Sequence, residues 1–157
     1  MNISAKVDYG VRAMLVLASE QRADESAPRP VTADQVAESQ GLPRKFLEAI
    51  LRDLRRAGLV VSTRGSAGGY ALARRAAEVT LGDIFRAVDG PLAEVRGLRP
   101  HETAYHEPAT VLPTVWVSLR AAIRSVLDEV TLDALLEDRL PDHVRQLADI
   151  PDAWANR

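Results

Sequence analysis

Apolar residues recur at three- and four-residue steps along much of this chain, which is the spacing of helices that bury one face. The first such stretch begins after Ser4, a suitable N-cap, and continues to about residue 21 through Val7, Met14 and Ala18. A polar segment over 22–30 then ends in Pro-Arg-Pro and predicts a loop.

Two short helices joined by a turn that contains glycine are predicted next. Thr32 caps the first helix, over 33–39, and Gly41 ends it. Pro43 opens the second helix, where its missing N–H costs nothing, and Gly58 ends it. This spacing is typical of a helix-turn-helix. The second helix is expected to bury Phe46, Leu47, Ile50, Leu51 and Leu54.

The pattern then changes to that of strands. A β-branched run over 59–63, a glycine-rich turn over 65–69 and a returning run over 70–73 predict a hairpin, which after a helix-turn-helix is a wing. Thr80 and Asp83 form a capping box that opens a further helix to about residue 88.

The last third of the chain contains its longest amphipathic stripe. Residues 92–110 show no periodicity and predict a loop of a length that is usually functional or mobile. Helical spacing then holds over 112–130, and short helices are expected over 131–136 and 142–148. The fold class is therefore mainly α with a small β-hairpin wing. We expect a winged helix-turn-helix domain over 1–90, a sensor-type loop over 91–110, and a dimerisation helix with a tail over 111–157.

Composition excludes several classes of protein. The 157 residues include no cysteine, which excludes disulfides, thiolate zinc sites, a cysteine nucleophile and a cysteine-ligated iron–sulphur cluster. The sequence contains no apolar run long enough to cross a membrane, and charges interrupt the N-terminal apolar stretch, so we expect a cytoplasmic protein. The sequence has neither a serine–base–acid order nor paired carboxylates, so nothing in it suggests an enzyme.

Charge is unevenly distributed along the chain. The net charge is −2, yet residues 1–75 carry +4 and residues 76–157 carry −6. Residues 43–75 alone hold eight basic and two acidic side chains. Such a local excess is expected of a nucleic-acid surface, although a solvated charged face would give the same count.

The helix that begins at Pro43 and the hairpin after it are the candidate DNA-reading elements. A recognition helix presents polar side chains near its N-terminus to the major groove. The outward positions there are Arg44, Lys45, Glu48 and Ala49, and Arg52, Arg55 and Arg56 are placed to meet phosphates. Alternatively, Arg52 and Arg55 cover apolar surface with their aliphatic stems. Arg64 stands at the root of the hairpin, where an arginine can enter the minor groove. The glycines of the turn, Gly65, Gly68 and Gly69, allow the backbone to approach the DNA duplex closely.

Four stretches of the sequence resemble the Rrf-two family of bacterial winged helix-turn-helix transcription regulators. They are ISAKVDYGVRAM (3–14), KFLEAIL (45–51), LRRAGLV (54–60) and RGSAGGYAL (64–72). The resemblance covers about residues 1–135. It implies a dimer in which a long C-terminal helix crosses its partner. It also implies DNA contacts at Lys45, Glu48 and Arg64, with Ser4, Lys6 and Tyr9 near the phosphates.

The chain departs from the family pattern in two places. Where the family often has glutamine after the recognition-helix glutamate, this chain has Ala49, so the operator sequence does not transfer. Cluster-binding members carry three cysteines in the loop that here spans 92–110 and has none. Asp8 matches a carboxylate ligand of some relatives, but without thiolates that role fails, and we expect no cofactor.

The loop offers weak candidates for another ligand. His101 and His106, each followed by a glutamate, would suit a divalent ion, although histidines in a polar loop are usually just exposed. Tyr105 and Trp116 could line a small-molecule pocket, but Trp116 is more often a core or interface residue.

The stripe over 112–130 holds more apolar surface than one winged-helix domain can cover, which predicts a dimer. The expected interface residues are Val115, Trp116, Leu119, Ile123, Val126 and Leu127. The sequence as a whole predicts a homodimeric DNA-binding regulator, a repressor of a palindromic operator that acts without a cluster. The alternatives are a regulator gated by a small molecule or metal in the 92–110 loop, a monomer whose helix folds back, and a protein-interaction module that has lost DNA binding.

Overall fold

Three of the predicted helices begin where a side chain accepts a backbone N–H group. The structure, a computed structural model, describes residues 2–24, 26 and 28–155. The Ser4 Oγ accepts from the Val7 N–H at 3.2 Å and opens the first helix. Reciprocal capping boxes, Thr32 with Gln35 and Thr80 with Asp83, open two others. These caps confirm three predicted helix starts.

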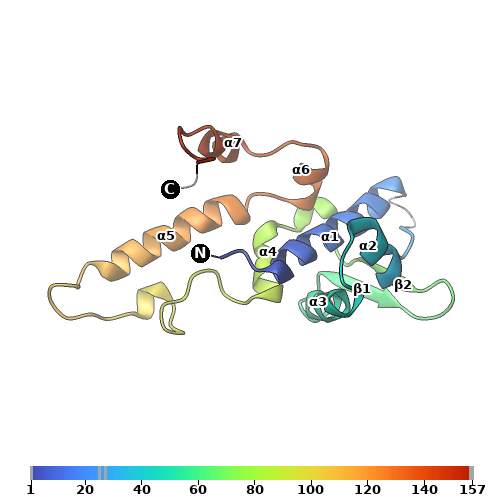
Figure 1. Cartoon of the computed structure of the whole chain (residues 1–157), viewed down its shortest axis with the longest axis horizontal. Helices are drawn as coiled ribbons and strands as arrows, with labels where there is room; N and C mark the ends of the chain where they lie inside the picture. The colour runs from blue at the N-terminus through green and yellow to red at the C-terminus, as the bar shows by residue number, and fades with distance from the viewer. Residues whose placement is uncertain (1, 25, 27, 156–157) are drawn as a thin grey trace.

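The first half of the chain forms three helices and a two-stranded hairpin (Figure 1). Its elements are α1 (Ala5–Ala23), α2 (Ala33–Gln40), α3 (Arg44–Arg56), β1 (Val60–Thr63) and β2 (Gly69–Leu72). The named elements of the second half are helices joined by loops. Its elements are η1 (Ala76–Glu78), α4 (Leu81–Val88), η2 (Pro100–Glu102), α5 (Leu112–Leu127), α6 (Leu132–Leu136) and α7 (Asp142–Ala148). Residues 25, 27, 156 and 157 of the predicted loop and tail lie outside the described residues.

The core forms where α1 packs against α3 and α4. Met14, Leu51 and Ile84, one from each helix, are fully buried there. A Cβ at Gly10 would lie 3.4 Å from the Ile84 Cγ2 and 3.5 Å from the Ile50 Cγ2. The glycine therefore lets α1 approach both neighbours closely, and α3 is held as a rigid element on the outside of this core.

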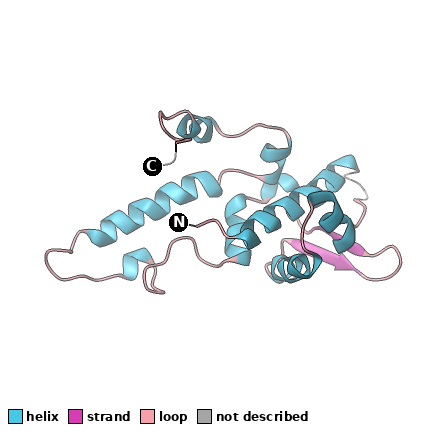
Figure 2. Ribbon diagram, viewed as in Figure 1, coloured by secondary structure: helices cyan, strands magenta, loops and turns pink. Residues whose placement is uncertain are grey.

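The hairpin is fastened to the segment before α2. β1 and β2 pair antiparallel, with Thr63 opposite Gly69. In addition, Tyr70 of β2 exchanges two backbone hydrogen bonds with Val31, both at 2.8 Å. Figure 2 shows the hairpin projecting beside α2 and α3. The hairpin is thus fixed to the segment that leads into α2.

The segment after α5 returns to the core. The Leu81 N–H donates to the Val130 carbonyl, and the Leu132 N–H donates to the Val79 carbonyl. The Leu132 side chain is fully buried. Residues 127–132 therefore complete the core of the winged helix, while most of α5 extends away from it (Figure 1).

The long loop before α5 is not irregular throughout. Val95 and Leu98 form a short antiparallel bridge, and η2 follows it. The hydroxyl of buried Thr103 donates to the Pro100 carbonyl at 2.7 Å. Among the described residues, no helix is both long enough and apolar enough to span a membrane.

Candidate nucleic-acid interface

The outward face of α3 carries cations of two kinds. Arg44 pairs with Asp34 of α2 and with Glu48 at 3.1 Å, and the hydrogen bond to Glu48 and the charge of Asp34 raise its pKa. Lys45 and Arg52 are exposed and form no ion pair with any described residue. Arg44 and Glu48 are therefore held by each other, while Lys45 and Arg52 are available to an anion.

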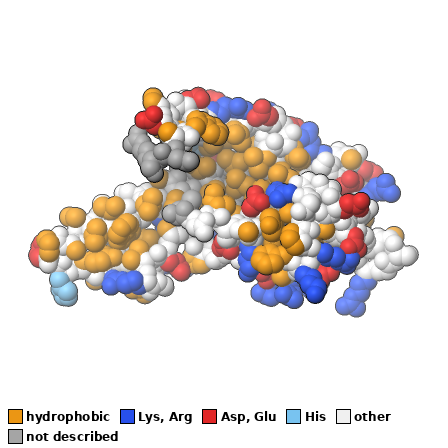
Figure 3. Space-filling view, viewed as in Figure 1, with side chains coloured by type: hydrophobic (Ala, Val, Ile, Leu, Met, Phe, Trp, Pro, Cys, Tyr) orange, Lys and Arg blue, Asp and Glu red, His pale blue; other side chains and the backbone are white. Residues whose placement is uncertain are grey.

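Arg55 joins α3 to the hairpin. Its Nη1 donates to the hydroxyl of Ser62 on β1 at 3.1 Å. The side chain therefore reaches across to the wing and keeps its charge at the surface between the two elements. Figure 3 shows lysine and arginine side chains gathered along the edge that α3 and the hairpin form.

At the wing, the glycines are required by the turn of the hairpin and by its close approach to the segment before α2. A Cβ at Gly68 would lie 2.5 Å from the Thr63 carbonyl oxygen, and a Cβ at Gly69 would lie 2.7 Å from the Val31 carbonyl oxygen. Gly65 has φ 105°, a conformation that other residues rarely adopt. Arg64 stands beside this turn, exposed, and is not ion-paired within the described ranges.

Phe46 is not a core residue, and its predicted burial is wrong. Its side chain is 46% exposed, and its ring lies edge-to-face on Tyr9 with centroids 6.2 Å apart. The buried face of α3 follows the three- and four-residue steps that begin at Leu47, and a residue one position earlier points about 100° away. The signal was available, because Phe46 breaks that spacing.

This ring contact brings the first turns of α1 to the N-terminal half of α3. Tyr9 packs on Phe46, and the Arg12 guanidinium lies 5.9 Å from the centre of the Tyr9 ring. Lys6 is exposed one turn earlier, next to the cap residue Ser4. The structure thus connects the α1 residues proposed to lie near phosphates to the candidate recognition helix.

The donor set of this chain does not fit an iron–sulphur cluster. The sequence has no thiolate to offer. His101 is exposed, and its Nε2 lies 3.9 Å from the Glu102 Oε1. His106 is also exposed. Asp8 lies on α1, where it pairs with Arg12. Within the described ranges, no three His, Asp or Glu side chains come together in a way that could hold a metal ion. His101 lies in η2 and His106 in the loop that follows it.

The apolar stripe of α5 divides into an inner and an outer half. On the inner half, the Trp116 Nε1 donates to the Tyr105 hydroxyl at 3.1 Å, Ile123 packs against the core, and Leu127 is buried in it. On the outer half, Val115 and Leu119 are 49% and 50% exposed. Figure 3 shows the apolar side chains that cover this part of the molecule.

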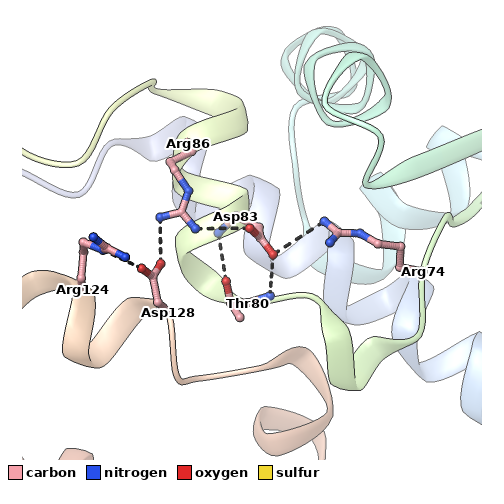
Figure 4. A network of polar contacts seen from close by, with 6 residues as sticks. All are labelled: Arg74, Thr80, Asp83, Arg86, Arg124 and Asp128. Carbon is pink, nitrogen blue, oxygen red and sulfur yellow. Dashed lines mark hydrogen bonds and ion pairs between the residues drawn. The ribbon is translucent and has the colours of Figure 1, made fainter.

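A polar network that sequence reasoning missed joins α5 to α4 (Figure 4). Asp128 accepts hydrogen bonds from Arg86 at 2.8 Å and from Arg124 at 2.9 Å. Burial opposes the charged form of Asp128, but the bonds from Arg124 and Arg86 outweigh it and lower its pKa. A Cβ at Gly82 would collide with this carboxylate. A glycine inside a predicted helix was the available signal.

Comparison with known proteins places these features in a family. A profile of the Rrf2 family, described as an iron-dependent transcriptional regulator, matches residues 3–138. An HTH-type transcriptional regulator of Mycobacterium tuberculosis is 46% identical over 149 residues, which are 95% of this chain and 89% of the relative.

Solved structures agree with this match. CymR of Bacillus subtilis, described as the global cysteine regulator of that organism, superposes with a TM-score of 0.68 at 34% identity, and the match covers 86% of this chain and 95% of CymR. IscR of T. potens superposes with a TM-score of 0.67 at 36% identity and covers 88% of each chain. The predicted fold class, mainly α with a two-stranded wing, is confirmed.

Proposed function

The chain belongs to the Rrf2 family of DNA-binding transcription regulators, and from this premise we propose that it is a homodimeric repressor that binds a palindromic operator. The observation that carries the proposal is the set of exposed cations on one edge of the molecule, at Lys45, Arg52 and Arg64, which no described residue neutralises. Unpaired cations on a rigid helix and wing suit a phosphate backbone. Members of this family are regulators rather than enzymes.

We assign the contacts by element. Lys45, Glu48 and Arg44 lie on the N-terminal half of α3, where a recognition helix meets base edges. Arg52 and Arg55 follow towards the phosphates, and Arg64 enters the minor groove from the wing. The remaining contacts are Ser4, Lys6 and Tyr9 at the start of α1 and the backbone of Gly65, Gly68 and Gly69.

The dimer is proposed from the outer half of α5. A contiguous exposed apolar face on a soluble protein marks a contact surface. Of the six residues that the sequence predicts at the interface, we place Val115, Leu119 and Val126 there. We assign Trp116, Ile123 and Leu127 instead to contacts within their own protomer, because Trp116 bonds to Tyr105, Ile123 packs against the core and Leu127 is buried. A two-fold dimer presents two α3 helices to half-sites about 34 Å apart, which is why the operator should be palindromic.

Repression needs no surface beyond the DNA-binding edge and the dimer face of α5. A dimer seated on an operator blocks access to that DNA, whereas activation requires a further contact to the transcription machinery. We place the protein in the cytoplasm, because a regulator of this family acts on genomic DNA. We divide its roles among a DNA-binding domain over 1–90, a loop over 91–110, and a dimerisation helix with a tail over 111–157.

The purified protein should select a subset of genomic fragments, and Arg64→Ala should weaken that binding by about 1–3 kcal/mol if the side chain reads a groove. Lys45→Ala should weaken binding too, and if Lys45 neutralises a phosphate the loss should be the same on all sequences, with the slope of log affinity against log salt lower by about one. Fluorescence anisotropy at several salt concentrations measures both effects. Arg29→Ala, on an exposed loop outside this edge, is the matched control. A wild-type protein with no preference among fragments would contradict the proposal and favour a protein-interaction module.

Protein purified without oxygen should be colourless and contain no stoichiometric iron or sulphide, because the chain has no thiolate ligand. Operator affinity should also be insensitive to thiol oxidants. Metal analysis and visible absorption spectra check this directly. A bound cluster would overturn the expectation and require ligands other than cysteine.

A further inference from the structure

A basic pocket lies between α4, the loop that follows it, and α5. It has a volume of about 450 Å³, which is in the range of small-molecule sites. Its charged lining consists of Arg86 from α4, Arg99 from the loop, and Arg120, Arg124 and Asp128 from α5 and its C-cap. The rest of the lining consists of small and apolar residues, Gly90 to Ala93.

The charges of this pocket are not balanced. Four guanidinium groups face one carboxylate, and that carboxylate is shared between Arg86 and Arg124. Arg99 and Arg120 form no ion pair in the part of the chain that the structure describes. Like charges around one half-open space repel each other unless an anion lies between them.

We propose that this pocket binds a small multivalent oxyanion, an organic carboxylate or phosphate, and that this anion is an effector of the regulator. Guanidinium groups match the paired oxygens of carboxylates and phosphates, and several of them converge here from three segments of the chain. Arg120 and Arg124 stand one turn apart on the same side of α5, while Arg86 and Arg99 approach from α4 and the loop. The anion site itself does not depend on the proposed DNA-binding function, whereas the role of the anion as an effector rests on it.

The pocket is connected to the wing by polar contacts (Figure 4). Arg86, besides binding Asp128, donates to the Asp83 Oδ1 at 3.2 Å. The other oxygen of Asp83 lies 3.6 Å from the Arg74 guanidinium, two residues after β2 ends. An oxyanion that takes hydrogen bonds from Arg86 competes with Asp83 and Asp128, so its binding alters the contacts at the base of the wing.

Binding is tested on the full-length wild-type protein without DNA. Isothermal titration calorimetry with citrate and with pyrophosphate, at constant ionic strength, separates a carboxylate from a phosphate preference. We expect saturable binding of at least one of them, one per chain, and a loss of about tenfold in Arg99→Gln and in Arg120→Gln. Arg29→Gln, an exposed arginine outside the pocket, should bind as the wild type does. No saturable binding of either anion, or equal binding by Arg120→Gln, overturns the site.

The dimer gives a second way to contradict the proposal. If neither anion binds the wild type but one binds a monomeric variant such as Leu119→Asp, the partner chain fills the pocket, and it is part of the interface instead of an effector site. Because these measurements contain no DNA, their failure leaves the proposed regulator intact, and a failure of operator binding leaves the anion site intact.

The effector role is tested by operator affinity with and without the saturating anion. We expect the anion to change the affinity of the wild type. Arg74→Gln, which cuts the link between Asp83 and the base of the wing, should still bind the anion but lose most of that change. Unchanged operator affinity in the wild type would show a binding site without regulation and overturn the effector role.

Discussion

Leu119→Asp should convert the dimer into monomers and weaken operator binding by about 10²–10⁴-fold. The side chain is half exposed on the outer half of α5, so a carboxylate is solvated in the monomer and the fold of each protomer is kept. In the dimer the same carboxylate would be buried in an apolar interface without a partner, which is strongly unfavourable. Each α3 would then bind its half-site alone, without the gain that comes from linking two sites.

Light scattering at micromolar concentration gives the oligomeric state, and anisotropy on a selected fragment gives the affinity. Leu147→Asp is the matched control, because Leu147 on α7 is 47% exposed and lies outside the proposed interface. It should stay dimeric and bind DNA normally. Leu119 is a sharper choice than Ile123, whose side chain packs against the core of its own protomer. A wild-type monomer at micromolar concentration would falsify the dimer.

Leu51→Ala should lower the free energy of unfolding by about 2–5 kcal/mol, because it leaves a cavity in a fully packed core. Leu51 has no exposed surface and holds α3 against α1 and α4. Urea unfolding followed by circular dichroism measures the change as a lower midpoint with the slope kept. The loss should be the same with and without salt, because no charge is involved.

The neighbouring residue provides the control on the same helix. Arg52→Ala changes an exposed side chain with no ion pair to a described residue, so stability should stay within about 0.5 kcal/mol of the wild type. Its DNA affinity should fall and become less dependent on salt. If Arg52→Ala destabilised the fold as much as Leu51→Ala, the side chain would be covering apolar surface, which is the alternative reading of its role.

Burial patterns within one helix were only partly predictable. The sequence shows one apolar stripe over 112–130, and the structure divides it between the core and the exposed face of α5. The same limit explains Phe46, which the hydrophobic count placed in the core and the structure places on Tyr9 at the surface. Periodicity identifies the apolar side of a helix, but a rotation by one residue decides which neighbours each side chain meets.

Local interactions let the sequence by itself determine most of the helices and the hairpin, while the DNA-binding residues on these elements stay predictions. Thr32 with Gln35, Thr80 with Asp83 and Gly65 with Gly68 act within a few residues, so their effects are readable in order along the chain. Only the tertiary structure decided that Arg86 meets Asp128, 42 positions away, and that four arginines share one pocket. Such contacts depend on how α4 and α5 pack against each other. That packing depends on the side chains of the whole core, so it cannot be read from the few residues that end up in contact.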